Sequence, residues 1–321
     1  MPFDRVRAID YAKKHWTTIC DDDLLCLDNE VVSIGQKRRE LKAPASDGWQ
    51  AKFVRYDDGT GHVAEKAVFQ KGGGEILIND WAGIADCAHF LSRSLQAGGA
   101  KVNERGVHGL VMALQARSDT KTLCDRVGKE GAQRVIDTGI FKNGDMLGYF
   151  NVRPDGDYGQ IRYTHSTMFA GKTSAADPGR ITCHSMCRFP GLSDIEDRWF
   201  LKDGYRYTLI HFTSGDGVVS ATTAKDQSGW WKVEFGAEKL FYNFLVDGRI
   251  RMSRAAPKKV RSTFVTPAII GNGHWFEKMG VFTLIWQSSG TVEIWTADAM
   301  SGGFKISRNS VLTGGASRMV A

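Results

Sequence analysis

Hydrophobic and polar positions follow two different periods along the chain. In roughly the first 140 residues, apolar side chains recur every three or four positions, which predicts amphipathic helices. Beyond them, β-forming segments separated by Gly, Pro and Asp turns predict antiparallel strands. The helices are expected at 4–19, inside Asn79–Gly99, at 107–117 and at 120–138, and the strands at 146–152, 160–171 and 179–189. This order of elements predicts an α+β fold.

The first two helices each have an apolar face with the spacing that a buried stripe requires. These faces consist of Val6, Ile9, Ala12 and Trp16 in the first helix and of Ile84, Ala88, Leu91 and Leu95 in the second. Gly98-Gly99 is expected to end the second helix after about four turns.

A β-rich stretch interrupts the helical half. Residues 49–56 and 63–70 each alternate apolar and polar side chains, and the segment DDGTGH between them is typical of a turn. We therefore expect a β-hairpin ahead of the second helix.

Strand patterns alone fill the last third of the chain. From Tyr205 onward, short β-rich segments recur about every 10 residues with Gly turns between them. This pattern predicts an all-β sandwich or a closed barrel. Residues 189–204 are the best linker candidate, so the predicted domains are 1–192 and 193–321.

Composition and charge narrow the class of protein. The 321 residues are 42% hydrophobic and 24% charged, which is typical of a folded globular chain. No apolar run approaches the roughly 20 residues that cross a bilayer. The net charge of +6 suits an anionic polymer, but no helix combines clustered Lys and Arg with aromatics, so nucleic acid is not an expected partner.

The first helix bears on where the protein works. It is charged and amphipathic, without the apolar core or the small-residue cleavage site of a signal peptide. We therefore expect the chain to be made in the cytoplasm, so that work elsewhere requires a specialised delivery route.

Cys87 is the candidate nucleophile among six irregularly spaced cysteines that we expect to be reduced. It lies in the first turn of the second helix, directly after Asp86. The unpaired N–H groups and the helix dipole favour a thiolate there. A lone Cys in a helix is more often a small core residue, so the hypothesis requires a base nearby.

Two histidines on neighbouring predicted strands can supply that base. His165 lies in 160–171 and His184 in 179–189, with a turn between them. Adjacent antiparallel strands can present both rings on one face. His165 is then expected to act as the base for Cys87, while His184 hydrogen-bonds its far nitrogen.

Other polar residues near Cys87 have plainer interpretations. His89 lies two positions further along the helix, about 200° around its axis, and is expected at the surface or the core edge. Asp21-Asp22-Asp23 is expected to be a solvated turn.

A zinc site is the chemical alternative in the later strands. Cys183, His184 and Cys187, with His165, are suitable ligand types. However, residues 183 and 184 point to opposite faces of a strand, and the chain contains no CxxC motif. We therefore expect neither a metal nor a cofactor.

Five segments together resemble a known family. They are AIDYAKKHW at 8–16, DCAHFLSRSLQAGG at 86–99, NGDMLGYF at 143–150, HSTMF at 165–169 and ITCHSM at 181–186. In this order they resemble papain-like cell-wall cysteine peptidases of the NlpC or CHAP type, and more closely the bacterial amidase domains of that superfold. The resemblance covers roughly residues 8–190, and it departs from the family at Ala88-His89 and in the β-rich insertion 49–78.

The resemblance implies a papain-like domain that hydrolyses amide bonds in peptidoglycan peptides through a thioester. Cys87 takes the place of the nucleophile, His165 that of the base, His184 that of the group orienting the base, and Asp86 that of a substrate-binding residue. It also implies an antibacterial effector or phage lysin, with a secretion apparatus or an immunity protein as partner. An acyltransferase using the same residues and a non-catalytic binding protein are the alternatives.

The C-terminal half is rich in tryptophan. Trp230, Trp231, Trp275, Trp286 and Trp295 lie there, and most aromatic residues of a β domain are core. An exposed aromatic platform for sugar rings is the functional alternative. Gly229 and Trp231 are also similar to the Gly-x-Trp of the first strand in lipocalin-like barrels.

Overall fold

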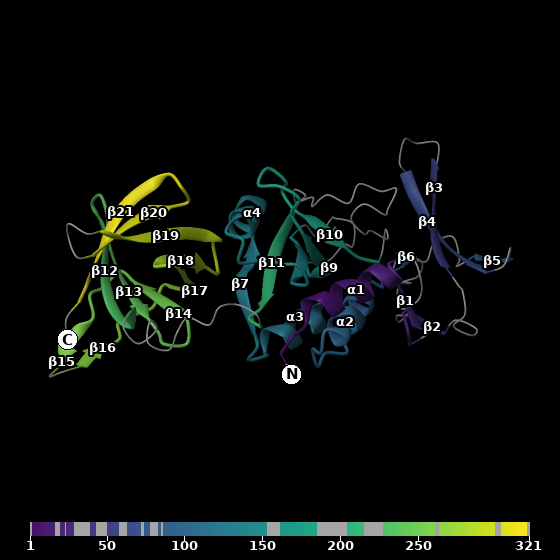
Figure 1. Cartoon of the computed structure of the whole chain (residues 1–321), viewed down its shortest axis with the longest axis horizontal. Helices are drawn as coiled ribbons and strands as arrows, with labels where there is room; N and C mark the ends of the chain where they lie inside the picture. Colours follow the sequence, from purple (N-terminus) through teal and green to yellow (C-terminus); the bar gives the residue numbers. More distant parts are fainter. Residues whose placement is uncertain are drawn as a thin grey trace. The chain divides into compact units, whose positions relative to one another are not determined.

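The computed structural model describes residues 2–16, 20–22, 24–28, 39–42, 50–57, 63–71, 74–77, 83–84, 86–152, 161–184, 204–214, 227–260, 263–298 and 303–319. The chain divides into two compact units. The first comprises Met1–Thr120 and Lys142–Tyr205, and the second comprises Lys121–Phe141 and Arg206–Ala321. Both helices and antiparallel strands are present, which confirms the α+β class (Figure 1). The predicted boundary at 192–193 lies outside the described residues.

Three helices belong to the first unit: α1 (Arg5–His15), α2 (Cys87–Ala97) and α3 (Val107–Gln115). Helix α1 packs against α2, and its buried side chains are Ala8, Ala12 and His15. The predicted apolar face of α1 is therefore only partly confirmed, since Ala12 is buried but Val6 is 69% exposed. Small alanine side chains let the two helices approach closely, and this contact decides which face is buried.

The apolar face predicted for helix α2 is confirmed from Ala88 onward. Ala88, Leu91 and Leu95 are buried, and Gly99 adopts a left-handed conformation with φ 91° after the helix ends. The helix is shorter than predicted, because Ile84 lies in strand β6 (Gly83–Ile84) rather than in a first helical turn.

An antiparallel sheet supports these helices in the first unit. Strands β8 (Met146–Asn151), β9 (Tyr163–Gly171) and β10 (Arg180–Thr182) occur in the order β10-β9-β8, close to where strands were predicted. Helices α2 and α3 both pack against β9.

Two smaller sheets complete the first unit. Strands β1 (Leu24–Asp28) and β2 (Arg39–Lys42) form one with β6, in the order β2-β1-β6. Strands β3 (Gln50–Asp57), β4 (Val63–Lys71) and β5 (Gly74–Leu77) form the other. Asp57 pairs with Val63, which confirms the predicted hairpin.

The second unit begins with a segment whose structure was wrongly predicted. Residues expected to form one helix from 120 to 138 form strand β7 (Thr120–Val127) and helix α4 (Lys129–Asp137). The buried residues of β7 are Leu123, Cys124 and Val127, and this spacing also fits a helix. Strand β11 (Tyr205–Phe212) is the hydrogen-bonded neighbour of β7.

A closed barrel of eight antiparallel strands forms the rest of the second unit, so the barrel prediction is confirmed over the sandwich (Figure 1). Its strands are β12 (Gly229–Phe235), β13 (Glu238–Phe244), β14 (Arg249–Ser253), β17 (Gly271–Lys278), β18 (Val281–Trp286), β19 (Thr291–Asp298), β20 (Gly303–Arg308) and β21 (Leu312–Arg318). Strand β12 pairs with both β13 and β21, which closes the barrel. A hairpin of β15 (Lys258–Val260) and β16 (Thr263–Val265) lies between β14 and β17 in sequence.

Alternation of inward and outward side chains explains the barrel core. In β13, Leu240, Tyr242 and Phe244 are buried, while the residues between them are partly exposed. Every one of the five C-terminal tryptophans named above is also buried. They are core residues, and the exposed aromatic platform is wrong.

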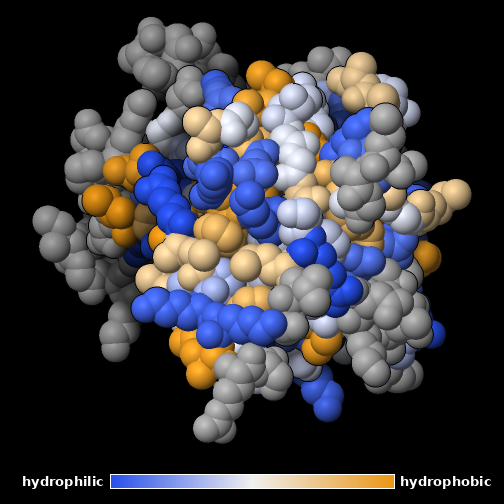
Figure 2. All heavy atoms as spheres, turned by 90° about the vertical axis from the view of Figure 1, so that its left-hand side faces the viewer, coloured by the Kyte–Doolittle hydropathy of each residue, from blue (hydrophilic) through white to orange (hydrophobic). Residues whose placement is uncertain are grey.

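Among the described residues that Figure 2 colours, hydrophobic and hydrophilic side chains are interspersed in this view and form no contiguous apolar face. Met279 and Val311 are examples of apolar barrel residues that are largely exposed. Single exposed apolar residues are usual and do not define a docking surface. A helix with the length and apolarity that a bilayer crossing demands is absent from the described part of the chain.

Candidate functional site

The candidate site is built at the start of α2. Cys87 is the first residue of this helix, and its side chain is 3% exposed. His165 lies in β9, where it is the cross-strand partner of Tyr149, with ring centroids 5.1 Å apart. Because α2 packs against β9, the elements that carry Cys87 and His165 are neighbours.

Asp86 precedes Cys87 and occupies the N-cap position of α2, yet its side chain does not cap the helix. Its carboxylate instead accepts hydrogen bonds from two imidazoles. His184 Nδ1 donates to Asp86 Oδ2 at 2.6 Å, and His89 Nδ1 donates to Asp86 Oδ1 at 2.9 Å. Asp86 was expected to bind substrate, but it is fully buried and both of its oxygens are occupied.

The two histidines also set the charge of Asp86. Burial alone would raise the pKa of this carboxyl group, because it disfavours the charged form. The hydrogen bonds and positive charges of His184 and His89 outweigh burial and lower the pKa below its ordinary value. Asp86 is therefore an ionised carboxylate at neutral pH.

His184 does not make the predicted bond to His165. Its Nε2 donates to the backbone carbonyl of His15 at 2.6 Å, and its ring stacks on Phe90 with centroids 4.0 Å apart. Since a carbonyl and an ionised carboxylate can only accept, both nitrogens of His184 act as donors in these two contacts. The expectation that His184 orients His165 is wrong, because both ring nitrogens are already used.

His89 is a member of the site that the sequence interpretation placed wrongly. It is fully buried rather than at the surface, and its Nε2 donates to Asp22 Oδ2 at 2.9 Å. Burial alone would lower the pKa of His89, but Asp86 and Asp22 raise it above its ordinary value. The missed signal was the three-residue spacing between Asp86 and His89, which places both on one helix face.

The turn after α1 is present as predicted, with the Asp21 side chain 51% exposed, and it also belongs to this network. Asp21 accepts hydrogen bonds from Tyr11 Oη at 2.7 Å and from Arg93 of α2 at 2.6 Å. Asp22 accepts from His89. These contacts hold the segment after α1 against α2, while Asp23 lies outside the described residues.

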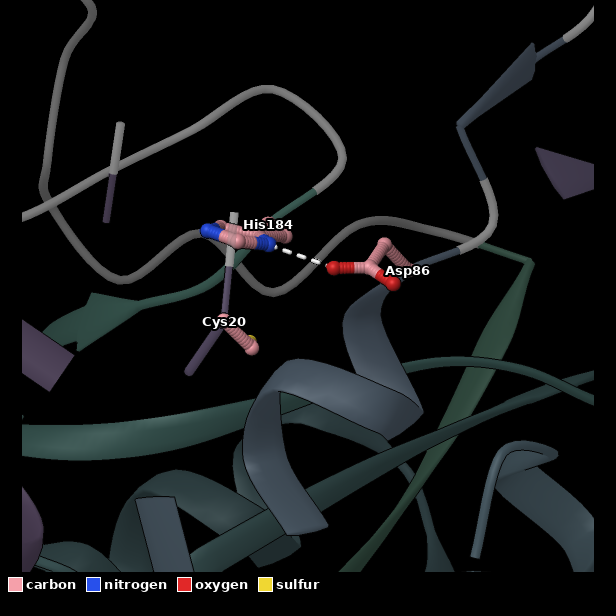
Figure 3. A group of neighbouring side chains, drawn as sticks. All are labelled: Cys20, Asp86 and His184. Carbon is pink, nitrogen blue, oxygen red and sulfur yellow. Dashed lines mark hydrogen bonds and ion pairs between the residues drawn. The ribbon is translucent and has the colours of Figure 1, made fainter. Parts of the chain in front are cut away.

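Cys20 completes a buried cluster that no sequence motif indicated. Ligand atoms of Cys20, Asp86 and His184 all lie within 4.8 Å of one another. Figure 3 shows one ring nitrogen of His184 directed at Asp86, with Cys20 beside the pair. The zinc ligands considered from the sequence are different: Cys183 is buried next to His184 in the chain, and Cys187 lies outside the described residues.

In comparisons with known proteins, no family model, no curated protein and no solved structure matches the chain.

Proposed function

We propose that the chain is a cysteine hydrolase that cleaves amide bonds, with Cys87 as the nucleophile and His165 as the general base. The observation that carries the proposal is the packing of α2, which begins at Cys87, against β9, which contains His165. The backbone N–H groups and the dipole at the start of a helix favour a thiolate, and such N–H groups can also bind a developing oxyanion.

The reaction is an acyl transfer in two halves. Cys87 Sγ attacks the substrate carbonyl while its proton passes to His165, and the tetrahedral intermediate then expels the amine. His165 returns the proton to the leaving nitrogen, which leaves a thioester on Cys87. In the second half, His165 takes a proton from water as the water oxygen attacks the thioester carbonyl. The C–S bond then breaks, His165 returns the proton to Cys87 Sγ, and the carboxylic acid leaves.

Asp86 and His184 have positioning roles in this proposal. The Asp86 carboxylate holds His89 and His184, and His184 also holds the His15 carbonyl. Together they fix the first turn of α2 and therefore the backbone at Cys87. Neither residue contacts the reacting atoms in this scheme.

Peptidoglycan stem or cross-link peptides are the proposed substrate. Support comes from the resemblance of the segments around Cys87 and His165 to cell-wall amidases, and from the net charge of +6, which suits an anionic wall polymer. A papain-like arrangement of the first unit is part of the same proposal. In an antibacterial effector or phage lysin, the enzyme would act outside the cell that makes it, with a secretion apparatus or an immunity protein as partner.

The test is hydrolysis of defined peptidoglycan fragments, with products identified by mass spectrometry. Cys87→Ala and His165→Ala should each lower kcat/KM by about 1,000-fold or more, because the pair acts as a unit. Cys124→Ala is the control, since burial raises the pKa of the Cys124 thiol to about 12 and makes it inert. Wild-type hydrolysis by the Cys87→Ala variant would contradict the proposal.

The same preparation distinguishes the alternatives. An acyltransferase would give an amide conjugate when an amine acceptor is added, in place of the free acid. A binding protein would give no product, and a thiol reagent would label all of its cysteines slowly and without preference. A hydrolase requires selective labelling of Cys87.

A further inference from the structure

Three side chains of types that can bind metal lie close together next to α2, although they come from separate parts of the chain. Cys20 follows α1, Asp86 precedes α2, and His184 follows β10. All three are almost fully buried, and their ligand atoms lie within 4.8 Å of one another (Figure 3). A thiol, a carboxylate and an imidazole are three of the ligand types that bind zinc in proteins.

We propose that Cys20 Sγ, Asp86 Oδ2 and His184 Nδ1 bind one divalent metal ion, with Zn²⁺ as the expected occupant. This site goes beyond the proposed hydrolase, because neither Cys87 nor His165 is among its ligands.

The geometry requires only small movements. Zinc lies about 2.0–2.3 Å from its ligand atoms, so ligand atoms around a tetrahedral ion are about 3.3–3.8 Å apart. The separations in the cluster exceed these values by at most about 1.5 Å, and the contact of 2.6 Å between His184 and Asp86 would have to open by about 0.7 Å. Metal would replace the proton that His184 and Asp86 now share.

The outer contacts needed to orient such ligands are already present. His184 Nε2 donates to the His15 carbonyl, which leaves Nδ1 as the nitrogen for a metal. Asp86 Oδ1 is held by His89, and His89 is held by Asp22. Metal-binding histidines and carboxylates commonly have outer partners of this kind, which fix the direction of the ligand atom.

The ligand set also indicates which metal binds. A thiolate with an imidazole favours zinc over magnesium or calcium, which prefer oxygen ligands. One thiolate and one carboxylate neutralise a divalent ion, which suits a buried site. Three protein ligands leave a fourth position for water.

A catalytic triad with Cys20 as nucleophile is the competing interpretation of the same three residues. A general base needs a ring nitrogen that can accept the thiol proton. Both nitrogens of His184 donate, to Asp86 and to the His15 carbonyl, so this histidine is not placed as a base. A metal site accounts for the cluster better.

The experiment uses the full chain after treatment with a chelator, titrated with Zn²⁺ and, separately, with Co²⁺. The wild-type chain should bind one ion, and Co²⁺ should give a thiolate-to-metal charge-transfer band. Cys20→Ser should abolish this band and weaken Zn²⁺ binding by at least about 100-fold, since it removes a direct ligand. Cys124→Ser, a buried cysteine in the other unit, is the matched control and should bind Zn²⁺ as the wild type does.

Two further measurements keep the test decisive. His89→Asn, which alters an outer contact, should weaken Zn²⁺ binding about 10–100-fold while the charge-transfer band remains. Native mass spectrometry of the wild-type chain needs no variant, so a variant that fails to fold does not block the test. A wild-type chain without stoichiometric metal, or an unchanged band in Cys20→Ser, would overturn the proposal.

The proposal of a metal site and the proposal of a hydrolase can each be rejected without the other. Cys87→Ala should lose hydrolysis and still bind one Zn²⁺, because Cys87 is not a ligand. Metal binding without any hydrolysis would reject only the hydrolase, and hydrolysis by a chain that binds no metal would reject only the metal site.

Discussion

At the scale of single residues, Asp86 is a buried charge that hydrogen bonds stabilise. A carboxylate removed from water costs several kcal/mol unless hydrogen bonds replace its hydration. Two imidazoles do so here, one from the same helix and one from the segment after β10. Asp86 therefore joins segments that are far apart in the sequence, and its replacement should affect all of them.

Asp86→Asn should destabilise the first unit by about 3–5 kcal/mol. The amide has one accepting oxygen in place of two, so one of the two imidazole donors stays buried without an acceptor. Urea denaturation measures the loss. Asp247→Asn is the control, because Asp247 pairs with Arg249 at an exposed position and should contribute less than about 1 kcal/mol. Equal losses in the two variants would show that Asp86 does not hold the site together.

At the scale of elements, a glycine sets the distance between α1 and the end of α2. The Asp4 N–H donates to the Gly98 carbonyl at 2.8 Å. A Cβ at residue 98 would lie 2.5 Å from the Phe3 ring and 2.8 Å from the Asp4 carbonyl oxygen. Since Gly98 has an ordinary helical conformation, with φ −75°, the need for glycine here is one of space.

Gly98→Ala should therefore destabilise the first unit by about 1–3 kcal/mol, because backbone atoms and a ring have to move. Gly109→Ala in α3 is the matched control. Its Cβ would meet only the flexible Glu104 side chain, and alanine favours a helix over glycine by about 1 kcal/mol. Thermal unfolding of both variants gives the comparison, and a stable Gly98→Ala protein would show that α1 can shift without cost.

Local patterns predicted the elements well wherever one period was unambiguous. The hairpin of β3 and β4 and the alternation of Leu240, Tyr242 and Phe244 in the barrel both follow a period of two. Strand β7 was missed because Leu123, Cys124 and Val127 also fit a helical period. Tertiary contact, and not local pattern, decided which face of α1 is buried.

The candidate site was only partly predictable for the same reason. The positions of Cys87 at the start of a helix and of His165 within a strand could be predicted, because both elements have recognisable patterns. The contacts of His184 and the contribution of Cys20 depend on segments that are distant in sequence, and no local spacing encodes them. His89 was the exception, since its position three residues after Asp86 was visible.

At the scale of the whole molecule, the second unit is assembled from two separate stretches of chain. Gln287, after β18, connects the two stretches. Its side-chain Nε2 donates to the Thr122 carbonyl at 2.7 Å, and its backbone carbonyl accepts from the Asp125 N–H at 2.8 Å. The same Gln287 side chain lies 3.1 Å from His274 Nε2. Since Gln287 Nε2 can only donate, His274 Nε2 accepts, and the ring is neutral with its proton on Nδ1.

This contact predicts how the second unit responds to acid. Burial, and secondly the charge of Lys121, lower the pKa of His274 to about 3, compared with about 6.5 in an unfolded chain. Above pH 6.5 the ring is neutral in both states and its contribution to stability is complete. As the pH falls from 6.5 toward 3, His274 becomes protonated in the unfolded chain but stays neutral in the folded chain. The free energy of unfolding therefore decreases by at most about 5 kcal/mol.

Replacing the ring isolates this contribution from that of the other acidic and basic groups. His274→Gln keeps a polar side chain that does not titrate, so its free energy of unfolding should fall less steeply between pH 6.5 and pH 3 than that of the wild-type chain. Urea denaturation at several pH values, followed by the fluorescence of the buried barrel tryptophans, measures both slopes. Parallel slopes would mean that His274 accepts a proton in the folded chain, and that its contact with Gln287 gives way without loss of the barrel.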